Sequence, residues 1–238
     1  MSGHSKWSTI KRKKGAADAK RGIAFTRISK DITLAARELG GNPEMNPALR
    51  LAIKKAKNAN MPLANIDRAI KKGTGDLPGV TYEDCVYEGY GPGGIAILME
   101  IFTDNKNRTL PEIRSLMTKN GGSLGESGCV NWMFEKKGII TINSSDIKEE
   151  EILEIFDLDV EDVISEDDFY EVITTPNNFS NISKYFESKE ISIDGKITLT
   201  PQNVVKVNSE IGEKAVKLIS ILEDHDDVQN IHSNFEIE

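Results

Sequence analysis

The sequence is poor in the features on which several classes of protein depend. It has two cysteines, Cys85 and Cys129, which lie far apart and outside any CxxC pattern. A disulfide framework is therefore excluded, and a reduced protein is expected. No apolar run approaches the roughly 18 residues that a membrane-spanning helix needs. The first residues are polar and basic and lack the apolar core of a signal peptide, so we expect a cytoplasmic protein.

Catalytic and metal-binding signatures are also missing. The sequence contains no nucleophile elbow, no HExxH and no Cys/His pairing. His225 lies within the acidic segment 223–227, but this spacing matches no metal motif, and an acidic helix end followed by a turn is expected instead. We therefore predict that the protein is not an enzyme and that it uses no cofactor and no metal.

Two glycine-rich segments resemble ligand-binding loops only in part. Residues 89–94 match GxGxxG, but the apolar residues 95–99 predict a strand where a dinucleotide site requires a helix. A hairpin loop is therefore expected. Residues 121–128 contain four glycines without the Gly-Lys-Ser/Thr ending of a P-loop. A long irregular turn is favoured there, and a close backbone approach or a loop beside a ligand is the alternative.

Acidic residues are in excess overall but scarce in the first third of the chain. Residues 1–72 hold 17 Lys+Arg and 5 Asp+Glu, a net charge of +12. The remainder holds 30 - 17 = 13 Lys+Arg and 38 - 5 = 33 Asp+Glu, a net charge of -20. This asymmetry indicates that the basic end contacts nucleic acid or another anionic surface. A solvated basic helical domain is the alternative.

The first third predicts a basic arm, residues 1–15, followed by three amphipathic helices. The first helix covers 16–39, the second begins at the Asn46 cap, and the third begins at Pro62 and stops at Gly73. The positions expected to be buried are Phe25, Ile28, Ile32, Ala35, Leu39, Leu49, Ala52, Ile53, Ala56, Leu63, Ile66 and Ile70. A linker is expected at 73–79.

The candidate nucleic-acid contacts are cations of the arm and of the helix surfaces, together with one aromatic residue of the arm. They are Lys6, Trp7, Lys11, Arg12, Lys13, Lys14, Lys20, Arg21, Arg27, Lys30, Lys54, Arg68, Lys71 and Lys72. The cations would neutralise phosphates, and Trp7 would either stack on a base or pack the arm onto the helices. Lysine and arginine outnumber amides, which favours backbone contact over base reading.

Beyond residue 79 the pattern changes to mixed strands and helices. Strands are expected at 80–90, 94–102, 130–142, 169–175, 191–200 and 228–237. Helices are expected at 110–120, 148–157, 176–188 and 209–222. Thr109-Leu110-Pro111-Glu112 predicts a capping box for the first of these helices, and Thr175 and Ser209 are further expected caps. Runs of strand-strand-helix-strand predict small ferredoxin-like units and an α+β fold class.

Ordered matches along nearly the whole chain resemble the YebC-type proteins. The matching segments are GHSKW (3–7), DAKRG (18–22), GNP (41–43), NMP (60–62), RAIKKG (68–73), YEGYGPGG (87–94), TDN (103–105), KNGG (119–122), FEKKG (134–138), PQ (201–202) and LEDHDDVQN (222–230). One departure is Ile23-Ala24, where the family often carries a lysine at the first position, so one cation is missing from the first helix.

The resemblance implies a helical domain followed by two α/β domains, the third inserted into the second. Applied to this sequence, it implies domains at 1–75, at 80–134 plus 205–238, and at 135–204. It also implies a regulatory role, because bacterial members are described as DNA-binding transcriptional regulators. A mitochondrial relative activates translation of a cytochrome oxidase subunit, and some bacterial members act at ribosomes stalled on proline runs.

We therefore expect a non-enzymatic DNA-binding transcriptional regulator whose arm and helices contact phosphates. The alternative is a translation factor that uses the same cations on ribosomal RNA. A remote alternative is an enzyme that uses the cleft between the two α/β lobes, lined by the two glycine-rich loops. The expected partner is nucleic acid rather than a membrane, and the sequence does not indicate the oligomeric state.

Overall fold

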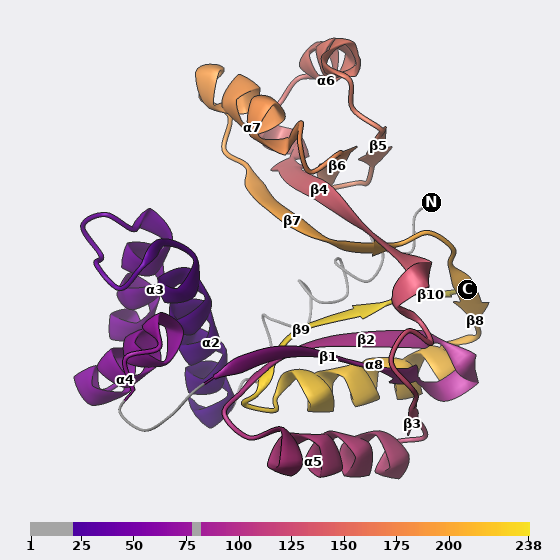
Figure 1. Ribbon diagram of the computed structural model, residues 1–238. Helices are drawn as coiled ribbons and strands as arrows, with labels where there is room; N and C mark the ends of the chain where they lie inside the picture. Colours follow the sequence, from indigo (N-terminus) through magenta and orange to yellow (C-terminus); the bar gives the residue numbers. More distant parts are fainter. Residues whose placement is uncertain (1–20, 78–81) are drawn as a thin grey trace.

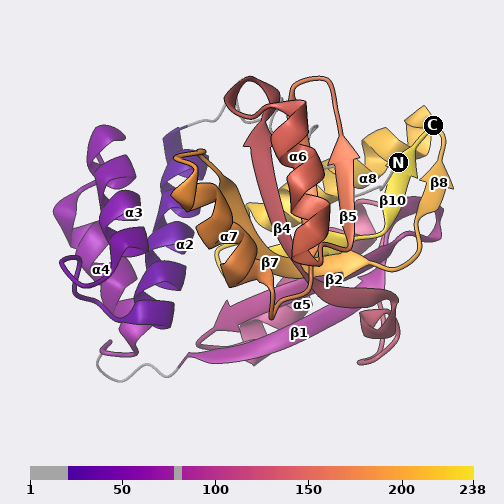
Figure 2. The same cartoon turned by 90° about the horizontal axis from the view of Figure 1, so that it is seen from above.

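The computed structural model of the protein describes residues 21–77 and 82–238. In these residues three helices precede two antiparallel sheets, which confirms the α+β fold class. The three helices lie together at one side of the first sheet (Figures 1 and 2). Two later helices cover one face of that sheet, and the second sheet stands on its opposite face. The part of the chain that the structure describes contains no helix long and apolar enough to cross a membrane.

The helical part has its own apolar core. It consists of α2 (Arg21–Leu39), α3 (Pro47–Asn58) and α4 (Leu63–Thr74). The buried side chains are Ile32, Ala35, Ala36, Leu49, Ala52, Ala56, Met61, Ile66 and Ala69. Two expectations were wrong, because Leu39 and Leu63 are 62% and 66% exposed. Each is the end residue of its helix, where a side chain can project past the shared core.

The predicted start of α3 is confirmed, and the predicted end of α4 is wrong. The Asn46 side chain accepts a hydrogen bond from Leu49 N, as a helix cap does. Gly73, expected to stop α4, lies inside the helix, which ends at Thr74 before the left-handed Gly75. A Cβ atom at Gly73 would lie 2.4 Å from the Thr33 carbonyl oxygen. Glycine is therefore needed here for the close packing of α4 on α2 and not for a turn.

The first sheet has the strand order β3-β1-β2-β9, and neighbouring strands are antiparallel. Its strands are β1 (Glu83–Tyr90), β2 (Ala96–Thr103), β3 (Ser123–Leu124) and β9 (Val228–Ser233). The helices α5 (Lys106–Lys119) and α8 (Ser209–Glu223) cover one face and bury a second apolar core. The side pair β8 (Val205–Val207) and β10 (Phe235–Ile237) is parallel.

The second sheet has the order β5-β6-β4-β7, the arrangement of a ferredoxin-like βαββαβ unit. Its elements are β4 (Phe134–Asn143), α6 (Glu149–Ile155), β5 (Asp162–Ser165), β6 (Phe169–Thr174), α7 (Phe179–Ser188) and β7 (Asp194–Pro201). A third core lies between this sheet and its two helices. In sequence, all of these elements fall between β3 and β9, which are both strands of the first sheet.

Several predicted element ends were wrong for identifiable reasons. The expected strand 228–237 is two strands, because the buried Asn234 side chain leaves the ladder to accept a hydrogen bond from Ala96 N. The strand expected from residue 130 starts at Phe134, because residues 131–133 form a short 3-10 turn. The short strands β3, β5 and β8 were not predicted, since two to four residues show too little periodicity.

Of the predicted helix caps beyond residue 100, Thr109 and Ser209 were wrong, whereas the Thr175 hydroxyl oxygen accepts a hydrogen bond from Asn178 N just before α7, as a cap does. Asn105 caps α5, and its side chain accepts a hydrogen bond from Arg108 N. Asn208 caps α8, and Asn178 precedes the first residue of α7. Thr109, expected to cap α5, is buried one turn inside that helix. Its hydroxyl group bonds to Asp227 instead, a long-range contact that local pattern reading cannot detect.

The two glycine-rich segments have different structures. Residues 89–94 contain the turn between the antiparallel strands β1 and β2, which confirms the hairpin. Residues 121–128 include β3, which pairs with the end of β1, so the expected irregular turn holds a strand. The buried Glu88 carboxylate fixes the next residues by accepting hydrogen bonds from the N–H groups of Gly128, Val130 and Asn131. Burial raises the pKa of Glu88, but these hydrogen bonds outweigh it and lower the pKa below its ordinary value.

Candidate nucleic-acid interface and interdomain cleft

The structure describes five of the fourteen candidate contact side chains. Those of the arm and of the chain up to Lys20, namely Lys6, Trp7, Lys11, Arg12, Lys13, Lys14 and Lys20, lie outside the described residues. Arg21 and Arg27 belong to α2, but their side chains are not described. Of the other five, Lys54 and Lys71 are exposed, Arg68 is exposed at the edge of the cavity described below, and Lys30 and Lys72 are half-buried.

One face is an exposed basic stripe on α3, formed by Arg50, Lys54 and Lys57 and called here the outer stripe. The spacing i, i+4, i+7 aligns these side chains along one side of the helix. Arg50 donates to the Pro43 and Glu44 carbonyl oxygens. Among the described residues, no carboxylate forms an ion pair with Lys54 or Lys57. The helix α2 lies between α3 and the first sheet in both views, so the outer stripe is remote from the acidic part (Figures 1 and 2).

Three other cations of the helical part, Lys30, Arg37 and Lys72, contact the first sheet and are called here the inner cations. Lys30 Nζ donates to the Glu223 carbonyl oxygen at the end of α8. Arg37 pairs with Asp84 at 2.5 Å, and its guanidinium group lies 4.8 Å from the centre of the Phe102 ring. These side chains therefore hold α2 against α8, β1 and β2.

Lys72 of α4 completes this contact through a pair of aromatic rings. Its ammonium nitrogen lies 4.9 Å from the centre of the Tyr82 ring and 5.8 Å from that of Phe102. The two rings are stacked with their centres 5.0 Å apart. A cation over an aromatic face is attracted by the ring quadrupole, and more strongly when water is excluded. Lys72 was expected on an exposed face, and the structure places it half-buried against these rings.

Burial lowers the pKa values of both inner lysines. The pKa of Lys30 falls to about 8 because burial outweighs the attraction of the Asp226, Glu223 and Asp224 carboxylates. The pKa of Lys72 is lowered for the same reason, against the attraction of Asp227 and Asp226. The charged form of each amine therefore costs free energy in the docked arrangement, even though acidic groups surround it.

A cavity of about 810 Å³ lies between the helical part and the first sheet. Its walls come from α2, α4, α5 and the turn after α8. The cations of the lining are Lys30, Arg68, Lys72 and Arg108, and the carboxylates are Asp104, Glu112, Asp224, Asp226 and Asp227. The two signs nearly balance, so the cavity is not a strongly cationic pocket. Neither glycine-rich loop lines it, and it is therefore not the cleft that the enzyme alternative assumes.

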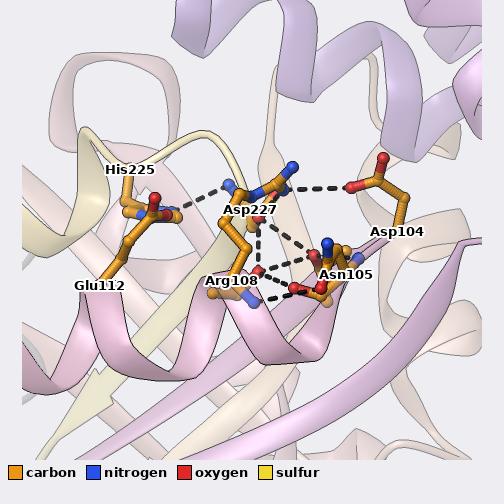
Figure 3. A network of polar contacts seen from close by, with 8 residues as sticks. Asp104, Asn105, Arg108, Glu112, His225 and Asp227 are labelled. Carbon is orange, nitrogen blue, oxygen red and sulfur yellow. Dashed lines mark hydrogen bonds and ion pairs between the residues drawn. The ribbon is translucent and has the colours of Figure 1, made fainter.

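The acidic wall of the cavity is organised around the buried carboxylate of Asp227 (Figure 3). One of its oxygens, Oδ2, accepts hydrogen bonds from Arg108 at 2.6 Å, from Thr109 at 2.7 Å and from Thr103 at 3.1 Å. Burial raises the pKa of Asp227, but the bonds from Thr109, Arg108 and Thr103 outweigh it and lower the pKa below its ordinary value. Asp227 therefore stays charged. Its lowered pKa and the three hydrogen bonds to Oδ2 make this carboxylate a weak proton acceptor, so it is poorly suited to act as a general base.

The neighbouring His225 joins the turn after α8 to α5. Its Nδ1 accepts a hydrogen bond from Asp227 N at 3.1 Å, and its Nε2 lies 3.0 Å from a Glu112 carboxylate oxygen. Because Nδ1 is an acceptor, the proton lies on Nε2 and is donated to Glu112. Across the described ranges, no cluster of three or more histidine, cysteine or acidic side chains could hold a metal ion. This network fixes the wall and offers no evident reaction.

This network was not predicted from the sequence, although its residues fall in segments that resemble the family. The segments 103–105 and 222–230 were quoted as separate matches, and the acidic run 223–227 was interpreted as a helix end with a turn. That interpretation is confirmed for the backbone, since α8 ends at Glu223. The pairing of Asp227 with Thr103 joins residues 124 positions apart, and only the tertiary structure brings them together.

Comparison with known proteins gives consistent matches over nearly the whole chain. Residues 5–76 match the TACO1/YebC protein N-terminal domain, and residues 82–235 match the TACO1/YebC second and third domain. A probable transcriptional regulatory protein of Desulfotalea psychrophila is 53% identical over 100% of this chain and 96% of its own length. A protein of the same printed name from Halothermothrix orenii is also 53% identical, with the same coverage.

A solved structure is similar as well. The crystal structure of a conserved hypothetical protein from Aquifex aeolicus superposes with a TM-score of 0.73 at 44% sequence identity. The match covers 93% of this chain and 92% of that one, so it includes the helical part and both sheets. With family models that match most of the sequence and relatives above 50% identity over its full length, the chain belongs to the TACO1/YebC family.

Proposed function

We propose that the protein is a non-enzymatic transcriptional regulator that binds DNA through its basic arm and helical part. The net charge of +12 on residues 1–72 supports this, because the phosphate backbone supplies most of the affinity in sequence-independent binding. Relatives at 53% identity carry the name probable transcriptional regulatory protein. The domain limits 1–75, 80–134 plus 205–238, and 135–204 remain part of the proposal, as does a cytoplasmic location.

The outer stripe is the observation that carries this proposal. Its three cations, Arg50 to Lys57, are separated by seven residue steps along α3, or about 10 Å at the rise of an α-helix. One DNA strand presents on the order of three phosphates over that length. The stripe is exposed, and the described carboxylates leave Lys54 and Lys57 without ion pairs. These side chains can therefore approach phosphates without first breaking an internal contact.

The chemistry of the stripe favours contact with the backbone over reading of bases. Lysine is a compact point charge that suits phosphate, whereas bidentate base recognition needs arginine, asparagine or glutamine. We therefore expect discrimination between DNA sequences of about tenfold or less, below the 10³ or more of dedicated repressors. Competition between a candidate promoter fragment and scrambled DNA of equal length measures it. A thousandfold preference for the promoter would contradict this proposal.

Charge reversal on the outer stripe tests the binding surface directly. The variant Lys54→Glu with Lys57→Glu should weaken DNA binding by at least about thirtyfold near 0.1 M salt and flatten the salt slope by about 2 units. The control is Lys206→Glu with Lys217→Glu, the same charge change on exposed lysines of the acidic part. If both variants bind equally, the stripe is not the interface.

Ribosomal RNA is the alternative target for the same cations. The acidic remainder, with its net charge of -20, would then face basic ribosomal protein. Co-sedimentation with ribosomes at several salt concentrations, beside a DNA-shift assay, separates the two targets. Salt-stable association with ribosomes together with unselective DNA binding would transfer the function to translation.

A further inference from the structure

We propose that the docked arrangement is autoinhibited: the acidic wall of the first sheet occupies the inner cations, and nucleic acid must displace that wall to reach them. The inference rests on the proposed function and concerns regulation of the same site. Lys30 and Lys72 are candidate phosphate contacts, and in the docked state they contact Glu223 and the Tyr82 ring instead. The acidic part therefore acts as an internal competitor for phosphate.

Apart from the stacked Tyr82 and Phe102 rings, the contact between the two parts is made mainly by polar and charged side chains, so it can open without dividing an apolar core. The apolar core of the helical part and that of the first sheet share no residue. Between them lies the cavity of about 810 Å³, lined by charged side chains from both sides. Separation would hydrate polar surface and uncover the Tyr82 and Phe102 rings, but it would leave both apolar cores intact, and a largely polar interface of this kind is typical of domains that move.

The individual links are of the kind that a polyanion can displace. The Arg37 and Asp84 side chains are 33% and 72% exposed, so salt screens their attraction. Lys30 is desolvated, and its lowered pKa means that its charge is poorly compensated in the docked state. A phosphate backbone offers the same side chains a fully charged anionic partner. The side chains also regain part of their hydration when they leave the docked state. The acidic wall thus competes with phosphate for the inner cations with moderate strength, and it does not hold them irreversibly.

No helix or strand of the described residues belongs to both parts, so separation of the two parts breaks none of these elements. The helix α4 ends at Thr74 and β1 begins at Glu83, and the sequence between them holds Gly75, Pro78 and Gly79. The predicted linker at 73–79 overlaps this connection. Separation of the two parts would uncover Lys30, Arg37 and Lys72 together, because all three belong to the helical part.

Neutralising the wall should release the inner cations in the full-length protein. The release variant combines Asp84→Asn with Asp226→Asn. The first substitution removes the ionic partner of Arg37. The second removes a carboxylate that attracts Lys30 and whose oxygen lies 3.5 Å from Thr26 Oγ1. The control is Glu126→Gln with Glu213→Gln, an equal charge change on exposed residues elsewhere in the acidic part. Binding of both variants to a 20-base-pair duplex of random sequence is measured from 50 to 300 mM salt.

The salt slope distinguishes release from a general change in charge. Each additional phosphate that is neutralised steepens the slope by about 0.9 on B-DNA. The release variant should therefore bind at least about fivefold more tightly than the control at low salt, with a slope steeper by about 2 units. The control should keep the wild-type slope, because it exposes no further cation. Equal slopes in the two variants overturn the inference.

A covalent lock tests the same point in one protein. Thr26→Cys with Asp226→Cys places two thiols where the native side-chain oxygens lie 3.5 Å apart, and oxidation joins α2 to the turn after α8. The oxidised form should keep a shallow slope, and the reduced form, which lacks the Asp226 carboxylate, should bind with a steeper slope, with oxidised wild-type protein as the control. Oxidised protein that binds as tightly and as steeply as reduced protein overturns the inference.

The two proposals fail in different ways. If the wild-type protein and every variant leave DNA and RNA unbound, the proposed function is wrong and the inference falls with it. If wild-type protein binds and reversal of Lys54 and Lys57 weakens binding, while the release variant equals its control, only the autoinhibition is wrong.

Discussion

The outer stripe and the inner cations belong to the same small group of helices, yet their surroundings are opposite. Arg50, Lys54 and Lys57 are exposed on α3. Lys30 and Lys72 are partly buried against acidic and aromatic groups, and burial lowers the pKa of each. All five residues contribute equally to the net charge of the first third. The difference shows that a count of charges indicates a contact surface without saying which charges are available to a ligand.

The comparison also shows what the acidic excess of the remaining chain can do. The excess carboxylates are not spread at random, since five of them line one cavity opposite the helical part. A basic domain followed by an acidic one can fold back on itself, and the acidic domain then selects which cations face solvent. The predictions below test whether this division of the cations is real.

The largest effect is expected when the two parts are separated. Fragment 76–238 should lose nucleic-acid binding altogether, because phosphate is repelled by its net negative charge. Fragment 1–75 should bind with a salt slope at least as steep as that of the whole protein, because no acidic wall covers its inner cations. Titration of both fragments, with circular dichroism to verify that each is folded, measures this. Tight binding by fragment 76–238 would contradict the division.

The arm is expected to contribute the next largest effect. Replacing Lys11, Arg12, Lys13 and Lys14 by alanine should flatten the salt slope on B-DNA by about 3–4 units if all four side chains contact phosphate. Thermal stability should not change, because these residues belong to no apolar stripe. A matched replacement of four exposed lysines in the acidic part serves as the control. An unchanged slope would show that the binding surface is limited to the helices.

Removal of the Asp227 carboxylate should damage the wall that holds the inner cations. Asp227→Ala leaves Thr103, Thr109 and Arg108 without their shared acceptor and should lower the free energy of unfolding by about 3 kcal/mol. Asp226→Ala, the exposed neighbouring residue, should cost less than about 1 kcal/mol. Urea denaturation of both variants gives the comparison. Equal losses would mean that the Asp227 network does not organise the wall.

The smallest effect concerns the burial of Lys30 and its dependence on pH. Because the pKa of Lys30 is about 8 when folded and near 10.5 when unfolded, the unfolded chain binds one more proton between these values. Stability therefore rises as pH increases from about 8 towards 10.5, and the cost of burying the charge is fully present below 8. Lys30→Met lacks this dependence.

The measurement for Lys30 is the difference in unfolding free energy between wild-type protein and Lys30→Met. From pH 7 to pH 9.5 the wild-type protein should gain on the order of 1 kcal/mol relative to the variant. Lys54→Met, on the exposed stripe, is the matched control and should show no such change. A constant difference across this range would indicate that Lys30 is solvated and that the inner face is more open than the docked arrangement suggests.

Much of the fold follows from local features of the sequence. The helices of the first third were predicted from 3–4 spacing and the Asn46 cap, because local sequence determines which face of a helix is apolar. The hairpin at 89–94 follows from glycine and proline between two apolar runs. The charge asymmetry, which supports the proposed contact with nucleic acid, is a property of composition and needed no structure.

Only the tertiary structure decided which polar residues act together and which cations remain accessible. Thr109 resembles a helix cap in sequence, and it is a buried partner of Asp227 because α5 and the turn after α8 pack side by side. Gly73 resembles a helix stop, and it is a packing position because α2 passes within contact distance. In the sequence, Lys30 and Lys54 are equivalent, since each is a lysine on the polar face of a predicted amphipathic helix. Desolvation and neighbouring charges distinguish them, and for Lys30 both depend on residues such as Glu223, 193 positions away, that periodicity cannot place.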